Sequence, residues 1–162
     1  MTPPLRIRRA ARALLLDSDD RVLLVRFEFP TATVWATPGG GQEPGEDDEA
    51  TLRRELREEL GLADVDIGPL VWMRRHVVPF LDGSWDGQRD HIYLVRTAPF
   101  EPAPMLSWEE LRAERLHELR WWTVDELCSV PVTTHFAPRT LPSLLADLIR
   151  DGVPETPIET GI

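Results

Sequence analysis

Residues 40–62 read GGQEPGEDDEATLRRELREELGL, and this stretch contains the clearest structural signal in the chain. It places three carboxylates, those of Glu55, Glu58 and Glu59, at helical spacing. Residues at positions i, i+3 and i+4 share one face of a helix, with Cβ atoms about 5–6 Å apart. Like charges at this distance repel, so a cation is expected to stabilise the arrangement. Mg²⁺ suits it, because this ion is commonly bound by carboxylates together with substrate phosphates.

The residues around these glutamates predict a helix from about 47 to 60. Acidic residues at its start favour the positive N-terminal end of a helix, and Gly61 is suited to its C-terminus. Leu52, Leu56 and Leu60 form an apolar stripe that we expect to pack on a sheet. Two of the glutamates flank this stripe, so they are expected at the edge of the core rather than in bulk solvent.

The stretch resembles the Nudix box, G-x5-E-x7-R-E-U-x-E-E-x-G-U, in which U is an aliphatic residue. At residue frequencies of about 7% for each of the seven fixed positions, a chance match at a given start is on the order of one in 10⁸. The resemblance implies an α/β fold, an α/β/α sandwich with a mixed β-sheet, and hydrolysis of a nucleoside diphosphate linked to another moiety. The pattern is met at every specified position, by Gly40, Glu46, Arg54, Glu55, Leu56, Glu58, Glu59, Gly61 and Leu62.

The resemblance also implies roles for residues of the box. The three glutamates and the Gly40 carbonyl are expected to hold a metal ion, with Mg²⁺ first and Mn²⁺ as an alternative. Glu55 is a ligand or the general base, and the identity of the base stays open. Arg54 is expected to orient one of the carboxylates. The implied catalytic residues are therefore Glu55, Glu58, Glu59 and Arg54, and the implied metal ligands are Gly40, Glu55, Glu58 and Glu59.

Residues outside the helix are expected to contact the substrate. Gly39, Gly40 and Gly41 let the backbone approach a ligand closely. Arg26, on the strand before them, could bind a phosphate through its planar guanidinium group. A later acidic residue is expected to complete the site, and Glu114 and Glu118 both qualify. Weaker candidates for the phosphate contact are Arg8, Arg9, Arg74, Arg75 and Arg89.

The remaining pattern indicates one domain over residues 1–150. It is followed by a polar, proline-containing tail, residues 151–162, that we expect to be poorly ordered. Strands and helices interleave in an order suited to a mixed sheet covered on both faces. The expected strands span residues 6–16, 21–29, 35–37, 67–78, 91–96 and 118–122, and the expected helices are 47–60, 140–150 and two short ones after Ser107 and Thr123.

The amino-acid composition argues against some classes of binding partner. The net charge is −10, which argues against a general affinity for nucleic acid or an anionic membrane, because both need a basic surface. No run approaches the roughly 18 apolar residues of a membrane span. The single cysteine excludes an intrachain disulfide and favours a reducing compartment, so we expect a cytoplasmic protein.

The expected partner is a nucleotide-type small molecule whose identity stays open. The options are a nucleoside triphosphate, an oxidised nucleotide and an ADP-ribose-like pyrophosphate. The alternative function is a non-catalytic domain that binds a nucleotide as a sensor, although a complete set of carboxylates favours the enzyme. A homodimer is retained as an alternative to a monomer, because many members of the family that this chain resembles are dimers.

Overall fold

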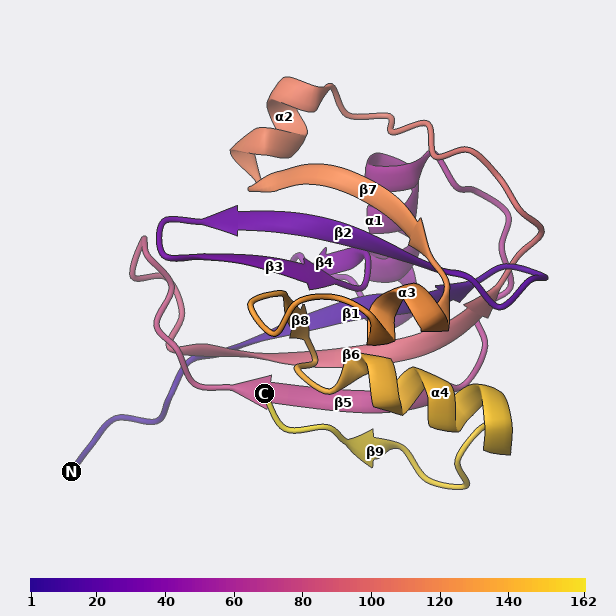
Figure 1. Ribbon diagram of the computed structural model, residues 1–162. Helices are drawn as coiled ribbons and strands as arrows, with labels where there is room; N and C mark the ends of the chain where they lie inside the picture. Colours follow the sequence, from indigo (N-terminus) through magenta and orange to yellow (C-terminus); the bar gives the residue numbers. More distant parts are fainter.

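The computed structural model describes residues 1–162 and contains four helices around a nine-stranded sheet (Figure 1). The strand order is β8-β3-β2-β1-β6-β5-β9, with β4 paired to β1 and β7 paired to β2. The sheet is mixed, since the β1–β6, β3–β8 and β5–β9 pairs are parallel and the others antiparallel. The elements are β1 (Ile7–Leu16), β2 (Val22–Phe29), β3 (Ala32–Ala36), β4 (Gly39–Gly41), α1 (Asp48–Leu60), β5 (Leu70–His76), β6 (Gly87–Arg96), α2 (Trp108–Ala113), β7 (Leu116–Trp122), α3 (Val124–Cys128), β8 (His135–Ala137), α4 (Leu141–Asp151) and β9 (Ile158–Glu159).

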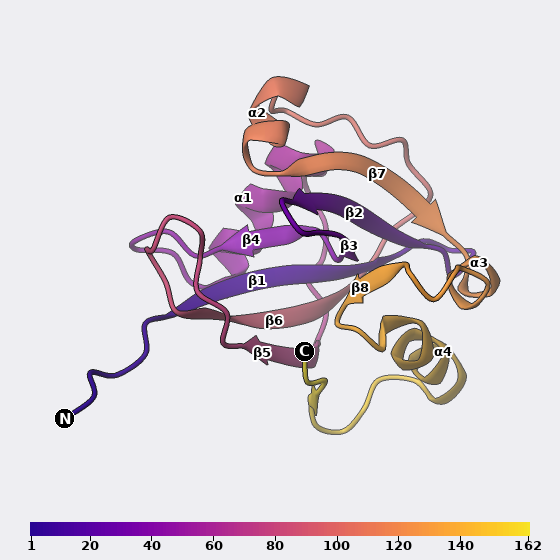
Figure 2. The same ribbon diagram turned by 60° about the vertical axis from the view of Figure 1, so that its left-hand side comes forward.

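Helices cover both faces of the sheet (Figures 1 and 2). On one face, α1 packs Leu52, Leu56 and Leu60 into a core cluster that also contains Leu15 of β1. On the other face, α3 and α4 pack on a cluster that contains Leu14 of β1. Successive strand residues point to opposite faces, so the apolar run of β1 can supply both clusters. The expected α/β/α sandwich is confirmed.

The sheet divides where β1 and β2 separate. These two strands pair at the register Leu16–Val22, next to the turn that joins them. Farther along, β1 pairs with β4 and β6, whereas β2 pairs with β3 and β7. Figure 2 shows the two halves diverging, with β2 and β7 above β1 and β6. This division positions β4 and the start of β7 on facing sides of the candidate site described below.

The glycine-rich segment Gly39–Gly41 is the short strand β4 rather than a loop. It pairs antiparallel with Ala10, Ala11 and Arg12 of β1. A side chain on these glycines would collide with neighbouring groups, among them the Ala11 carbonyl oxygen, 2.3 Å from an ideal Cβ on Gly39. Only glycine therefore lets this backbone lie so close to the central strand.

The chain after α4 also differs from the expectation of a poorly ordered tail. β9 pairs in parallel with β5 at Trp72–Ile158 and Met73–Glu159. The N–H group of Thr160 donates to the Met73 carbonyl at 2.9 Å. A segment of two paired residues is too short for a periodic pattern, and the prolines around it are typical of loops. None of the helices is both long and apolar enough to cross a membrane.

Candidate metal-binding active site

The helix α1 is fixed at both ends, and this fixes the direction of its glutamates. The Asp47 side chain accepts a hydrogen bond from the Ala50 N–H group at 2.8 Å, which caps the N-terminus. Gly61 ends the helix in the left-handed conformation, with φ at 66°. Between these caps, the leucine stripe is buried against the sheet, so that the adjacent face of the helix points toward β4.

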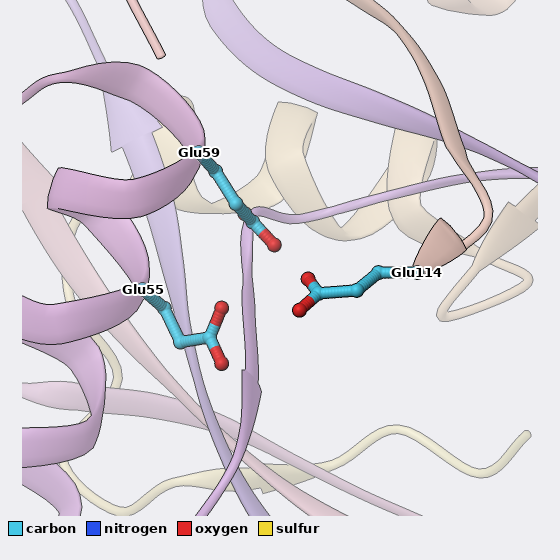
Figure 3. A group of neighbouring side chains, drawn as sticks. All are labelled: Glu55, Glu59 and Glu114. Carbon is cyan, nitrogen blue, oxygen red and sulfur yellow. The ribbon is translucent and has the colours of Figure 1, made fainter. Parts of the chain in front are cut away.

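Three carboxylates meet at this face. Glu55 and Glu59 of α1 and Glu114, which follows α2, each place an oxygen within 4.8 Å of the others. Figure 3 shows the three side chains directed toward one another from two separate elements. Glu55 is 7% exposed and Glu59 is 3% exposed, whereas Glu114 is exposed. We call Glu55, Glu59 and Glu114 the glutamate cluster.

The environment opposes the ionisation of all three groups. Burial is the main factor that raises the pKa of Glu59 well above its usual value, and the Glu55 charge adds to the effect. Burial likewise raises the pKa of Glu55, and the attraction of Arg54 offsets this only in part. The pKa of Glu114 is raised by the partial burial of its carboxyl group, although the residue as a whole is exposed, and then by the Glu58 charge. A positive charge placed among these oxygens would remove the electrostatic penalty.

Few protein donors reach the two buried carboxylates. Glu59 Oε2 accepts a hydrogen bond from the Gly39 N–H group at 3.1 Å. Glu55 Oε1 accepts one from Arg54 at 3.0 Å. The second oxygen of each carboxylate, Oε2 of Glu55 and Oε1 of Glu59, accepts no hydrogen bond from the protein. Carboxylate oxygens that lack protein donors, on residues that are otherwise buried, are suited to a hard cation.

Arg54 ties the glycine-rich segment to the helix. It donates to Glu46 at 2.8 and 2.9 Å and to the Gly41 carbonyl at 3.1 Å. It also donates to Glu55 at 3.0 Å and to Glu58 at 3.3 Å, and it forms a longer ion pair with Glu43 at 3.7 Å. The hydrogen bonds from Arg54 are the main factor that lowers the pKa of Glu46 to about 2. Arg54 therefore joins the glycine-rich segment and Glu46 to the helix, and it holds one carboxylate of the cluster.

Glu58 lies beside the cluster rather than in it. Its side chain is 30% exposed and contacts Arg54, and its carboxylate is not among the three groups whose oxygens lie within 4.8 Å of one another. Its backbone carbonyl accepts hydrogen bonds from Met105 and Leu106. Of the residues expected to bind metal, the structure brings Glu55 and Glu59 together and leaves Glu58 at the rim.

Gly40 is packed against the cluster itself. An ideal Cβ on Gly40 would lie 2.5 Å from Glu55 Oε1 and 2.7 Å from its carboxyl carbon. Gly39, with φ at 135°, presents its N–H group to Glu59. Two of the three glycines thus let the backbone approach the carboxylates without a side chain between them.

Position distinguishes Glu114 from Glu118, the two acidic residues expected to complete the site. Glu118 pairs across strands with Arg26, at 2.9 Å between Nε and Oε2. Arg26 also pairs with Glu28. The guanidinium of Arg26, expected to contact a phosphate, therefore already has two carboxylate partners, and Glu114 rather than Glu118 joins the cluster.

Arg12 and Asp90 support the site and are not evident from the sequence. Arg12 donates to Asp90 at 2.9 Å, to the Thr37 carbonyl at 3.0 Å and to the Gly39 carbonyl at 3.4 Å. It thereby links the start of β4 to a buried carboxylate on β6. The alternation of β1 could have shown that Arg12 faces inward, but nothing local identifies a partner 78 residues away.

A cavity of about 470 Å³ lies on another side of α1. Its lining includes Asp48, Leu52, Asp66 and Tyr93. No member of the glutamate cluster lines it, and Asp48 is already bound to Arg9, His91 and Tyr93. The chemistry of the cluster is therefore separate from this cavity.

Comparison with known proteins agrees with this geometry. A family model described as the NUDIX domain matches residues 6–144. The chain belongs to the Nudix family. The matched region contains the whole glutamate cluster together with β4 and Arg54, so the family assignment and the site refer to the same part of the molecule.

This chain is similar to individual Nudix proteins over different shares of its length. The chain is 46% identical over 63 residues to the nucleoside triphosphatase NudI of Salmonella typhimurium, a match of 38% of this chain that spans 43% of the relative. It is 25% identical to a MutT NUDIX hydrolase from Burkholderia pseudomallei, with a TM-score of 0.58 over 86% of this chain and 98% of the other. The NUDIX domain of Shewanella oneidensis NrtR, solved with ADP ribose, is 17% identical with a TM-score of 0.64 over 88% of each chain, which shows a common fold.

Proposed function

We propose that this Nudix protein is a metal-dependent hydrolase that cleaves a nucleoside diphosphate linked to another moiety. The observation that carries the proposal is the glutamate cluster, in which carboxylates from α1 and from the segment before β7 converge within 4.8 Å. A domain that only binds a nucleotide has no need of buried like charges, which destabilise the fold unless a cation compensates them. The cluster therefore supports catalysis more strongly than simple binding.

Mg²⁺ fits this donor set, and Mn²⁺ is the alternative. Glu59 and Glu114 would hold the ion, with the Gly40 carbonyl and Glu58 as further ligands from the box, and Glu55 is a further ligand or the base. When bound, such an ion neutralises phosphate charge and lowers the pKa of a bound water. Arg54 donates to one oxygen of Glu55, and Gly39 donates to one oxygen of Glu59. The other oxygens, Glu55 Oε2 and Glu59 Oε1, have no protein donor.

The protein's own groups also suit the proton transfer of hydrolysis. Glu55 and Glu59 both lie in the glutamate cluster, where a carboxylate is placed to accept the proton of a water molecule. We assign the base to Glu55, because Arg54 fixes its orientation through Oε1 and leaves Oε2 to take the proton of the attacking water. Glu59 is then left as a ligand.

The substrate class is a small nucleotide. Similarity to a nucleoside triphosphatase supports a nucleoside triphosphate or its oxidised form. The likeness to a domain solved with ADP ribose is a likeness of fold, and it retains a nucleotide sugar as an option. Hydrolysis of a panel of these compounds, with Mg²⁺, with Mn²⁺ and with a chelator, tests the proposal. Turnover of at least one compound that stops on chelation is expected, whereas nucleotide binding without turnover would support the sensor function instead.

The change Glu59→Gln tests the site more directly. It removes a charge from the cluster with little change of shape, and we expect kcat to fall by at least about 100-fold. Glu49→Gln, on the exposed side of the same helix, is the matched control and should retain activity. Near-native turnover by the Glu59→Gln variant, with its fold intact by circular dichroism, would remove Glu59 from the mechanism.

A further inference from the structure

Arg8 is a partly buried guanidinium group that has almost no hydrogen bonds. It lies on β1, on the strand face that also carries Arg12. Its one hydrogen bond, from Nη1 to Gln88 Oε1, is 3.5 Å long, and it takes part in no ion pair. An arginine has five N–H donors, so most of those of Arg8 lack a protein acceptor. Burial, followed by the nearby charge of Arg12, lowers the pKa of Arg8.

The position of Arg8 is next to the glutamate cluster. The charges of Glu55 and Glu114 both act on its guanidinium group. The group lies over Gly41, and an ideal Cβ on Gly41 would be 1.9 Å from its Nε and Nη2 atoms. The Phe80 ring, 5.6 Å from its Cζ atom, flanks it. Arg8 thus stands at the end of β4, against the glycine that follows the one packed on Glu55, with most of its donors unused.

Three other arginines near this place already have carboxylate partners. Arg12 and Arg74 share the buried carboxylate of Asp90, and Gln88 donates to the same group at 2.7 Å. Arg54 is bound to Glu46 and Glu55. Arg8, by contrast, can accept an anionic ligand without breaking an ion pair.

We propose that Arg8 binds the diphosphate of the substrate. Its free N–H groups donate to the non-bridging oxygens of a phosphate that extends beyond the glutamate cluster. The inference rests on the proposed function, and it adds a positively charged residue to the acidic site. A planar guanidinium group suits two oxygens of one phosphate. Gly41 has a part in this arrangement, because any side chain there would displace the guanidinium group.

Binding of methylenediphosphonate tests the proposal without turnover, since its P–C–P linkage cannot be hydrolysed. Calorimetry in the presence of Mg²⁺ compares the wild type with three variants. For Arg8→Gln we expect affinity to fall by about 10- to 100-fold, the range for losing hydrogen bonds to a charged group. Arg8→Lys keeps the charge but loses the planar guanidinium group, so its affinity should lie between those of the wild type and Arg8→Gln. Gly41→Ala should weaken binding, because the added methyl group displaces an otherwise unchanged Arg8.

Arg9→Gln is the matched control. Arg9 is the next residue of β1, but it points to the opposite face and pairs with Asp48. We expect this variant to bind methylenediphosphonate as the wild type does. Equal affinities of the Arg8→Gln and Arg9→Gln variants would overturn the proposal, and so would a wild type that does not bind the compound. Melting temperatures of all variants establish that they are folded. If Arg8→Gln does not fold, the Arg8→Lys variant still tests the proposal.

The kinetics distinguish this proposal from the general function. With the best substrate of the nucleotide panel, Arg8→Gln should raise KM by about 10-fold or more with a smaller effect on kcat, because the contact exists before the reaction as well as during it. If no nucleotide is hydrolysed, the proposed function fails while diphosphonate binding still decides the role of Arg8. If hydrolysis occurs and both arginine variants are kinetically alike, only the role of Arg8 fails.

Discussion

At the scale of single residues, helical spacing predicts which side chains of α1 meet, but it gives no information on residues from elsewhere. Glu55 and Glu59 are one helical turn apart, and their proximity follows from local geometry. Glu58 is equally close in sequence, yet it lies at the rim with Arg54. Glu114 could be predicted only as one of two options, because its approach depends on how β7 pairs with β2.

The distinction between Glu114 and Glu118 leads to a prediction for two identical substitutions. We expect Glu114→Gln to raise the Mg²⁺ concentration required for half-maximal activity by at least about 10-fold, the lower end of the loss seen when even an outer partner of a metal ligand is removed. Glu118→Gln removes only a partner of Arg26 and should change little. Titration of activity with Mg²⁺ measures both. A larger effect in the Glu118 variant would contradict the geometry of the site.

At the scale of elements, the long periodic segments could be predicted and the short paired ones could not. β1, β2, α1 and α4 have enough residues to show a period. β4, β8 and β9 have three residues or fewer, and they are strands because partners in the sheet supply their hydrogen bonds. β4 in particular reads as a loop in sequence, since glycine disfavours strands unless a close approach requires it.

The close approach of β4 to β1 predicts that two glycines differ in their tolerance of alanine. Gly39 and Gly45 both have positive φ, at 135° and 82°. A Cβ on Gly39 meets the backbone of β1, whereas one on Gly45 meets nothing within 4 Å. Gly45→Ala should therefore lower the free energy of unfolding by about 1–2 kcal/mol through strain alone, and Gly39→Ala should lower it by clearly more. Urea denaturation measures both, and equal losses would refute the steric explanation.

At the scale of the whole molecule, one buried carboxylate joins three strands, β1, β5 and β6, on one side of the divided sheet. Asp90 of β6 is 2% exposed and pairs with Arg12 of β1 and Arg74 of β5. Burial alone would raise the pKa of Asp90, but the two guanidinium groups and a hydrogen bond from Gln88 outweigh burial, so that its pKa lies below the usual value. Its charge therefore stabilises the native state relative to the unfolded chain, in which the carboxyl group has its ordinary pKa.

The sign of this shift determines a pH dependence. A depressed native pKa contributes stability that is complete above the unfolded pKa of about 3.9 and is lost as pH falls through the native value. Asp90→Asn leaves two largely buried arginines without their counterion, and it should lower the free energy of unfolding at pH 7 by about 3–5 kcal/mol. The difference between wild type and variant should stay constant from pH 7 to about 4 and shrink below that. Urea denaturation at several pH values measures it, with Asp86→Asn, at an exposed ion pair, as the control that should show little loss. A difference that grows toward acid pH would mean that Asp90 is not held in its charged form by Arg12 and Arg74.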